Sequence, residues 1–308
     1  MDGKLLVRTV LDSLDLPVHD ELTADLRMIY YYLDSAVVEF VRETRCLTTT
    51  TTITTVASQQ TYDLPPDFIA LYLKNNNDRF IVKYYDGSQY WWPTKVSYDA
   101  IFYDNETEAQ DTPDVFAITD ANDPGSVTGS ATSDGAQTGG ECTLTDSTKQ
   151  FTSTDLVYAR DIVHNITDDS DGIVLEVVSD TELKTALFDG KSNQWSSGDE
   201  YRIERSGHKQ ITFDAPCSTA GHIVTVPYVC MPQPVFSSYR NWRFPASTCR
   251  AVCMEAAYLY ASQKEDFAMA DRLRAAFAEE VRRYRIETAR STLQGGRYSD
   301  IGIYRTRL

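Results

Sequence analysis

The stretch "CLTTTTTITTVASQQTYDLPPDFIALY", from Cys46 to Tyr72, decides how the rest of the chain is interpreted. Threonine and isoleucine are β-branched and favour extended backbone, so the threonine run predicts a strand with hydroxyl groups on at least one face. A polar turn follows, and then a short return strand closed by Pro65 and Pro66. Asp67 can cap the apolar segment after it, which is hydrophobic enough to cross a core. The stretch therefore predicts strands and turns, not a linker.

Helical segments flank this strand region on both sides. Apolar residues recur every three or four positions between Leu5 and Leu14, and again between Thr23 and Arg45. Near the other end, Pro245 is expected to open a helix, and Asp266 is expected to be the N-cap of the next one. The sequence therefore predicts one helix pair at each end of the chain.

The last residues are expected to leave the final helix. Gly295 and Gly296 are predicted to end it, because glycine is common just after helix C-termini. The basic and aromatic segment that follows, residues 297–308, is predicted to be an extended arm with no place in the core.

Between these ends the composition changes at Ala121. Residues 122–141 are rich in Gly, Ser, Thr and Asp, as domain junctions are, and strand-like pieces then recur at regular intervals up to Arg205. This pattern favours a small all-β barrel or sandwich, residues 122–205, inserted into another domain. Two later segments, 209–216 and 222–234, are expected to form a hairpin that joins the strands before Ala121.

The predicted fold class is therefore α+β, with a helical core, antiparallel strands and an inserted all-β domain. The core domain is discontinuous, comprising residues 1–121 and 206–296, and the arm of residues 297–308 follows it. A chain of 308 residues is long enough for two such domains, each with its own core.

Charge is distributed very unevenly. The net charge is −16, and residues 99–204 contain 23 acidic and 5 basic residues, a balance of −18. Residues 272–308 contain 9 Arg and 4 acidic residues, a balance of +5. Proteins that hold nucleic acid tightly are basic, so this composition argues against a DNA-binding protein. An acidic surface does suit a wall past which DNA slides without sticking.

The motifs of enzymes and metal sites are weak or missing in the sequence. The segment Thr167–Gly172 resembles the start of a calcium loop, but its first ligand position is Thr167 and its twelfth is Val178, so an acidic β-turn is favoured. The four histidines share no zinc spacing, and Gly-x-Ser-x-Gly, P-loop and Gly-x-Gly-x-x-Gly motifs are not found. We therefore expect no catalytic residues, no cofactor-binding residues and no metal ligands.

The cysteines and tryptophans do not indicate a metal, disulfide or sugar-binding site either. The six cysteines show no Cys-x-x-Cys pair, and Cys249 and Cys253 lie one helical turn apart, which favours reduced core residues. Trp91, Trp92 and Trp195 could stack on sugars, but tryptophan is more often found in a core or an interface.

The order of these segments resembles a known family. A helical pair, a threonine-rich strand, "QQTYDLPPDFIALY", further strands, "PYVCMPQP" and "RFPASTCRAVCMEAAYLYA" are similar to the head-to-tail connector (adaptor) proteins of short-tailed bacteriophages. The most specific part of the resemblance is the family motif after the threonine run: Tyr62, Leu64, Pro65, Asp67 and Phe68. The resemblance covers most of the chain but not the inserted β segment.

The resemblance implies a structural, non-enzymatic virion protein at the head-tail interface. It implies a dodecameric ring that binds the portal protein, contacts tail or nozzle proteins below it, and continues the channel through which genomic DNA passes. It also implies that the C-terminal arm binds the portal, through Arg297, Tyr298, Ile301, Ile303, Tyr304, Arg305, Arg307 and Leu308. With neither an apolar span of about 20 residues nor a signal-peptide cleavage site, synthesis in the host cytoplasm and no membrane partner are expected.

Two alternatives from other classes stay open at this point. One is a cell-envelope (peptidoglycan) hydrolase, since some related adaptors are associated with wall-degrading activity. The other is a carbohydrate-binding virion protein whose site lies in the inserted β domain.

Overall fold

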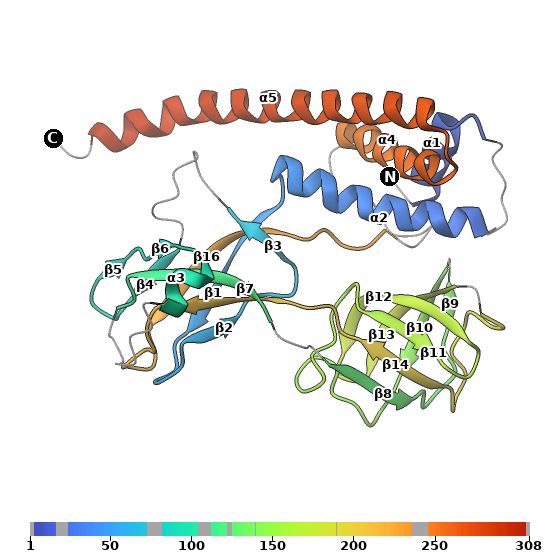
Figure 1. The fold of residues 1–308 in the computed structure, drawn as a ribbon, viewed down its shortest axis with the longest axis horizontal. Coiled ribbons are helices and arrows are strands. Elements are labelled where there is room, and N and C mark those ends of the chain that lie inside the picture. The colour runs from blue at the N-terminus through green and yellow to red at the C-terminus, as the bar shows by residue number, and fades with distance from the viewer. Residues whose placement is uncertain are drawn as a thin grey trace. The chain divides into compact units, whose positions relative to one another are not determined.

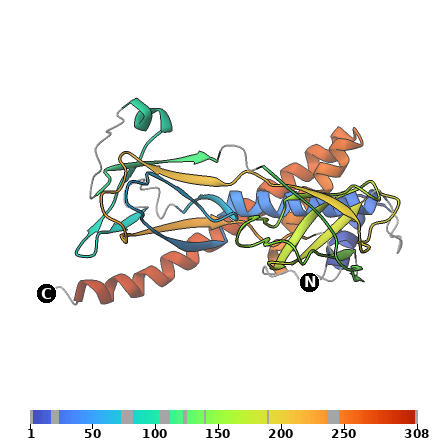
Figure 2. The ribbon, with the colours of Figure 1, turned by 90° about the horizontal axis from the view of Figure 1, so that it is seen from below.

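The computed structural model describes residues 3–16, 24–72, 82–103, 112–121, 125–138, 140–188, 190–235 and 246–305. The chain divides into two compact units, a helical unit of Met1–Thr44 with Val235–Leu308, and a β unit of Arg45–Pro234. The fold is mixed α+β, as predicted, with five helices and mainly antiparallel sheets among the described residues (Figures 1 and 2).

The helical unit joins the two ends of the chain. It contains α1 (Gly3–Ser13), α2 (Ala24–Thr44), α4 (Ala246–Gln263) and α5 (Phe267–Arg305). Both predicted helix pairs are present, and α4 packs against α1, α2 and α5. Their apolar stripes form the core, in which the buried side chains include Leu6, Val10, Ile29, Leu33, Val37, Phe40, Val252 and Phe277. Pro245 lies outside the described residues, and α4 begins at Ala246.

Polar and left-handed residues define several of the helix ends. Asp15 and Glu265 follow α1 and α4 with φ of 54° and 60°, a conformation that closes a helix C-terminus. The N–H of Asp266 donates back to the Ala261 carbonyl at 3.0 Å. The carboxylate of Asp266 accepts from the Met269 N–H at 3.1 Å, which confirms the predicted N-cap of α5.

The predicted end of the last helix is wrong. Helix α5 continues through Gly295 and Gly296 to Arg305, and Figure 1 shows it extending well past α4. Residues 297–305 are therefore helical, not extended. A glycine in a helix costs only about 1 kcal/mol relative to alanine, and two glycines do not stop a helix in which neither adopts the left-handed conformation.

In the β unit, two sheets share one core. The first has the order β1 (Thr48–Thr54), β16 (Ile223–Cys230), β4 (Lys83–Tyr85) and β5 (Tyr90–Trp91), with β3 (Phe68–Leu71) also on β16. The second has the order β2 (Thr61–Asp63), β15 (Lys209–Phe213), β7 (Val115–Asp120) and β6 (Thr94–Lys95), and only β6 and β7 are parallel. Short helix α3 (Tyr98–Tyr103) precedes β7. Side chains of both sheets meet in one cluster that includes Tyr62, Phe68, Tyr84, Phe116, Ile211, Phe213 and Val226.

This pairing corrects the expected hairpin. Strands β15 and β16 do pair with strands from before Ala121, but not with each other. The return strand β2 likewise pairs with β15 and not with β1. Successive strands cross between the two sheets because each contributes apolar residues to the common core, and this burial outweighs local hairpin pairing.

The segment rich in Gly and Ser contains a separate antiparallel sheet. Its order is β8 (Ser126–Ser130), β14 (Glu200–Glu204), β11 (Ile162–Asn165), β12 (Ser170–Ser179), β13 (Glu182–Phe188), β10 (Glu141–Thr145) and β9 (Gln137–Thr138). Just after β8, the Thr132 N–H donates to the Thr145 carbonyl at 2.7 Å, which curls the sheet towards a barrel. It encloses its own core of Leu144, Phe151, Val163, Leu183, Trp195 and Ile203.

The two strands that connect the seven-stranded sheet to the rest of the chain, β7 before it and β15 after it, are neighbours in the second sheet. They pair antiparallel with Asp120 opposite Lys209. One residue further along, the Ala121 N–H donates to the His208 carbonyl at 2.9 Å. A two-residue turn could therefore connect Ala121 to His208 and leave the ladder intact.

Deleting residues 123–206 should leave a folded remainder, if the insertion proposal is right. The deletion joins Asn122 to Gly207, and Asn-Gly is the preferred pair for a two-residue hairpin turn. We expect one cooperative thermal transition by calorimetry. The matched control replaces the joined pair by Ala-Ala, which disfavours positive φ and should lower stability by about 1–3 kcal/mol. A remainder without a cooperative transition would contradict the insertion.

Candidate interaction surfaces

The family motif forms a turn that joins β2 to β3. The Phe68 N–H donates to the Pro65 carbonyl at 2.9 Å, which places Pro66 at the turn position that proline favours. The side chains of Tyr62, Leu64 and Phe68 are buried in the shared core. The motif residues thus hold the fold together and are not exposed to a ligand.

Asp67 ties this turn to the central strand β16. Its carboxylate accepts from the Tyr228 hydroxyl at 2.9 Å, and its carbonyl accepts from the Met231 N–H at 2.6 Å. Phe68 stacks on the Tyr228 ring with centroids 5.5 Å apart. Burial and the hydrogen bond to Asp67 raise the pKa of Tyr228, so the hydroxyl remains a donor. The structure thus shows a cross-strand anchor at Asp67, where the sequence suggested a cap for the apolar segment that follows.

Replacing Tyr228 by Phe should destabilise the protein by about 1.5–3 kcal/mol, because a part-buried hydrogen bond to a carboxylate is lost. The matched control is Tyr85→Phe, whose exposed hydroxyl donates to the Gly87 carbonyl, and this change should cost at most about 0.5 kcal/mol. Denaturant unfolding measures both. Equal losses in the two variants would show that Asp67 does not anchor the turn.

The threonine strand β1 lies at the edge of the first sheet. It pairs with β16 over seven consecutive residues, from Thr48 opposite Val229 to Thr54 opposite Ile223. No other described strand pairs with it. Thr48, Thr50, Thr52 and Thr54 are exposed, and only Thr51 and Ile53 are half-buried. This strand therefore offers an exposed, uncharged edge.

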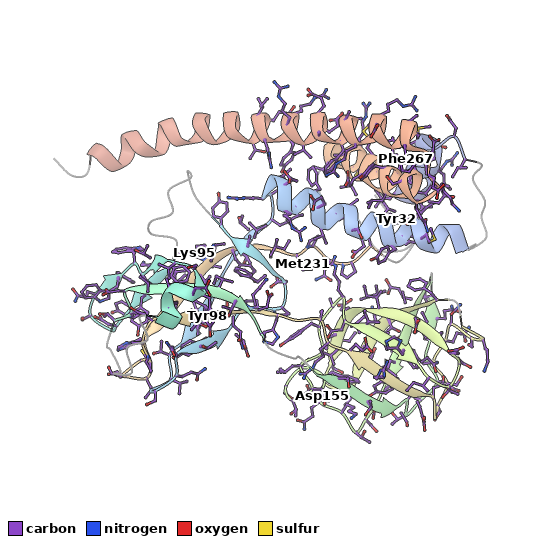
Figure 3. The ribbon with its side chains drawn as sticks, viewed as in Figure 1. Tyr32, Lys95, Tyr98, Asp155, Met231 and Phe267 are labelled. Atoms are coloured by element: carbon purple, nitrogen blue, oxygen red, sulfur yellow. The ribbon has the colours of Figure 1, made fainter. Side chains whose placement is uncertain are left out.

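A second exposed surface is the aromatic hairpin β4–β5 at the opposite edge of the same sheet. Tyr90, Trp91 and Trp92 are 50, 39 and 45% exposed. Figure 1 places β4, β5 and β6 together, and Figure 3 labels Lys95 and Tyr98 beside them. Exposed aromatic residues that cluster in this way are typical of protein interfaces.

Asp86 fixes the shape of this hairpin. One carboxylate oxygen accepts from the N–H groups of Ser88 and Gln89 at 2.7 Å, and the other from the indole N–H of Trp91 at 3.1 Å. These hydrogen bonds lower the pKa of Asp86. The Lys83 ammonium lies 3.6 Å from the centre of the Tyr90 ring. The aromatic side chains are thus held in place in the absence of a partner.

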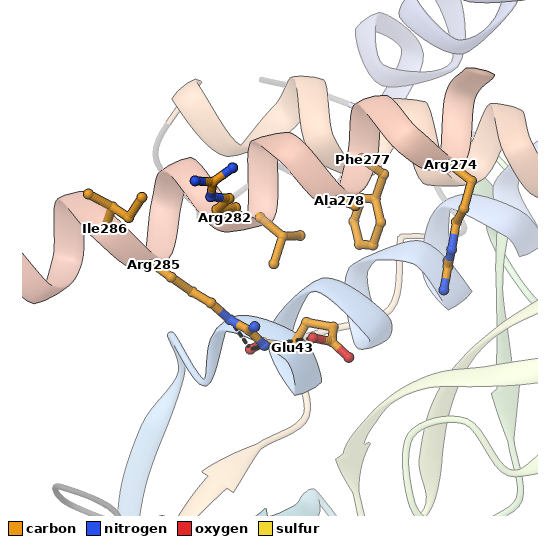
Figure 4. A pocket seen from close by; sticks show the side chains of 8 residues that line it. Glu43, Arg274, Phe277, Ala278, Arg282, Arg285 and Ile286 are labelled. Carbon is orange, nitrogen blue, oxygen red and sulfur yellow. Dashed lines mark hydrogen bonds and ion pairs between the residues drawn. The ribbon is translucent and has the colours of Figure 1, made fainter. Parts of the chain in front are cut away.

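The helical unit carries a groove of about 420 Å³ between α2 and α5 (Figure 4). Its walls combine apolar and cationic side chains: Phe277, Ala278, Val281 and Ile286 with Arg274, Arg282 and Arg285, and Glu43 from α2. The Arg285 guanidinium contacts the Glu43 carboxylate at 2.6 Å and closes one end. The groove sits where α5 begins to extend past its neighbours.

Near this groove, Glu255 of α4 is a buried carboxylate, 3% exposed. One of its oxygens pairs with Arg274, whereas the other has no hydrogen-bond partner among the described residues. Burial raises the pKa of Glu255 despite this pair, while the same pair raises the pKa of the half-exposed Arg274. The carboxylate bears most of the desolvation because it is the more deeply buried partner.

Glu255→Gln should stabilise the protein by a margin that grows with pH. Below about pH 4 the Glu255 side chain is mostly protonated and therefore neutral, like the glutamine that replaces it. As pH rises through the raised pKa of the folded state, the wild-type carboxylate ionises at a burial cost that glutamine avoids. We expect the difference in Tm between variant and wild type to increase from pH 4 to pH 7. The matched control is Glu279→Gln at an exposed position of the neighbouring helix, and the increase should be larger for Glu255→Gln than for this control. A constant difference for Glu255→Gln would contradict this account.

One cluster of potentially reactive side chains, Tyr84, Cys217 and His222, lies inside the core of the β unit. The Tyr84 hydroxyl lies 2.7 Å from the Cys217 sulfur and 2.8 Å from His222 Nδ1, and all three residues are buried. Trp195 is 1% exposed and donates to the Thr185 hydroxyl at 2.9 Å, so it cannot stack on a sugar. Of the tryptophans considered above, Trp195 is thus a core residue, whereas Trp91 and Trp92 are exposed.

The calcium-like segment is the turn of the β11–β12 hairpin. The Asp168 N–H donates to the Asn165 side chain at 3.1 Å, and Asp171 contacts His164 at 2.5 Å. Asp169 adopts φ of 55°, as tight turns require. Within the described ranges, no three His, Cys, Asp or Glu side chains gather as metal ligands. The segment is an acidic β-turn.

The predicted portal-binding residues belong to the C-terminal end of the chain, and most of them lie in the last turns of α5. Arg297, Tyr298, Ile301, Ile303, Tyr304 and Arg305 lie in the last part of α5, where the backbone alone is described, and Arg307 and Leu308 lie outside the described residues. Their role remains a prediction. None of the helices that the structure describes has both the length and the apolar character that a membrane crossing requires.

The first part of the chain matches a known family. Residues 1–125 match the family model described as SU10 adaptor protein. The match spans α1, α2, β1 to β7 and the family motif, whereas the whole seven-stranded sheet, β15, β16, α4 and α5 lie outside it. No curated protein matches the chain.

Over residues 1–125 the chain is therefore similar to phage adaptor proteins. The resemblance to head-to-tail adaptors, which the motif around Asp67 indicated, is confirmed over residues 1–125.

Proposed function

We propose that this protein forms a ring, dodecameric by family resemblance, that connects the portal to the tail and continues the DNA channel. The observation that carries the proposal is the adaptor-family match over residues 1–125, in which the motif that gives the resemblance also anchors the fold. The protein acts by binding its neighbours, as a non-enzymatic component of the virion. Its partners are the portal protein, tail or nozzle proteins, and further copies of itself.

The domain organisation proposed for this role is a discontinuous core with an insertion. Residues 1–121 and 206–296 provide the adaptor core, and residues 122–205 an additional β domain. The pairing of β7 with β15 beside the entry and exit of the seven-stranded sheet supports this division. The carbohydrate-binding alternative loses support, because the tryptophan of the inserted segment is buried.

Passage of DNA requires a channel that does not hold it. The balance of −18 over residues 99–204 would repel phosphate groups wherever these residues face the channel. The basic end of the chain, with a balance of +5 over residues 272–308, is separate from this acidic segment. We propose that the basic end binds the portal, through Arg297, Arg305 and Arg307 among others.

Mass photometry of the protein with the portal ring of the same phage tests this function. The wild-type chain should decorate the portal with a fixed number of copies. Truncation after Gly296 should leave Tm nearly unchanged, since the last turns of a terminal helix contribute little stability, and should abolish attachment to the portal. A control with Arg297, Arg305 and Arg307 changed to Lys keeps the charge and should retain partial binding. If the truncated chain decorates portals as well as the wild type, this segment is not the anchor.

A further inference from the structure

The backbone of β1 directs half of its hydrogen-bonding groups away from its partner strand. The Thr55 N–H donates to the His222 carbonyl at 2.9 Å, and the Cys230 N–H donates to the Leu47 carbonyl at 3.1 Å. Bonded pairs alternate along an antiparallel ladder. Thr49, Thr51 and Ile53 therefore bond to β16, while the N–H and C=O groups of Thr48, Thr50, Thr52 and Thr54 point outwards.

Among the described residues, this edge has none of the features that usually protect an exposed strand. The register with β16 is regular over all seven residues, without a bulge, and β1 contains no proline and no charge. Proteins normally block such edges with lysine, proline, a bulge or a covering segment, because an open edge pairs with other chains. A long, regular, uncharged edge is therefore suited to accept a strand.

The opposite edge of the same sheet is also open. In the β4–β5 hairpin, Asp86 donates its N–H to the Gln89 carbonyl at 3.3 Å, so the next bonded pair is Tyr84 with Trp91. Tyr90 is consequently a non-bonded residue, and its N–H and C=O point away from β4. No described strand pairs with β5 on that side. The exposed rings of Tyr90, Trp91 and Trp92 lie along this edge.

The strand directions match for a contact between these two edges. Each neighbouring pair along β1, β16, β4 and β5 is antiparallel, so β5 runs opposite to β1. If β5 of one copy met β1 of another, the antiparallel order would continue from copy to copy. A contact between two different surfaces of identical subunits is heterologous. Such contacts form a ring where the rotation between neighbouring copies closes, and an open filament where it does not.

The lack of charged side chains along β1 favours a second copy of the chain, and not an unrelated protein, as the partner that binds this edge. The chain carries a net charge of −16, so copies of it repel each other. An interface between like-charged copies is least unfavourable where charge is missing, and residues 46–62 contain no charged side chain. An oppositely charged partner would instead be expected to meet a charged rim.

We propose that β5 of one copy adds to the free edge of β1 in the next copy, so that the sheet continues around the ring. This inference rests on the proposed ring. Backbone hydrogen bonds from Thr48, Thr50, Thr52 and Thr54 would provide the attraction, and the aromatic side chains at β5 would be covered in the same contact.

Proline substitutions test the two edges separately. Thr50→Pro with Thr52→Pro removes only outward-pointing N–H groups of β1, and Tyr90→Pro does the same at β5, so the intramolecular ladders are retained. The matched controls are Thr50→Ala with Thr52→Ala, and Tyr90→Ala, which keep the N–H groups. Thr50→Lys with Thr52→Lys is a second blocked form of β1 that involves no proline strain. Thermal unfolding establishes that each variant folds.

Mass photometry, with and without portal rings, gives the result. Each blocked variant should lose all species larger than a monomer in solution, whereas the alanine controls should assemble. An equal mixture of a β1-blocked and a β5-blocked variant should form dimers and nothing larger, because one intact β1 and one intact β5 remain. Folded blocked variants that assemble like the wild type, or a mixture without dimers, would overturn the strand addition. A wild-type chain that stays monomeric in solution and on portals would instead overturn the proposed ring.

Discussion

The pairing of β16 with strands from the first part of the chain is the constraint on which the β unit depends. β16 pairs with β1 along one side and with β3 and β4 along the other, so it joins residues 48–54, 68–71 and 83–85. Pro227 has no N–H, but the ladder with β1 stays complete because Thr50 opposite it belongs to the non-bonded pairs. On the other side the Pro227 carbonyl accepts from the Tyr72 N–H at 3.0 Å. Asp67 then fixes the end of β16 through Tyr228 and Met231. The family motif is therefore a device for holding this central strand in register.

The sequence predicts local structure well where one physical signal dominates. The apolar periodicity of α2, the β-branched run of β1 and the N-cap at Asp266 each act within a few residues, and each was predicted at its observed place. The existence of strands in the seven-stranded sheet was predicted from the same kind of local evidence. The resemblance carried by Tyr62 to Phe68 agrees with the adaptor-family match over residues 1–125, because this turn chemistry is specific.

What could not be predicted depends on distant partners. The choice of β16 and not β2 as the neighbour of β1 follows from burial in a core shared by two sheets, which local pattern does not encode. Composition alone does not separate Trp195, which is buried, from Trp91 and Trp92, which are exposed. The Asp86-Gly87 turn before Tyr90 is the signal that could have placed those two on a hairpin edge. The helix through Gly295 and Gly296 was missed because a breaker residue sets a cost and not a prohibition.

The position of β1 at the edge of its sheet offers a physical reason why threonine recurs along it. Valine or isoleucine at Thr48, Thr50, Thr52 and Thr54 would keep the β propensity but expose an apolar strand to solvent in the unassembled chain. Lysine or glutamate would keep the strand soluble, but would add charge to a contact between copies of an already acidic chain. Threonine is β-branched, polar and neutral, so it satisfies both conditions at once. Serine is polar and neutral too, but it lacks the branched methyl that favours extended backbone. Under the proposed strand addition, β1 has to remain soluble alone and still pair with a like-charged copy, and threonine is the residue that most simply meets both conditions.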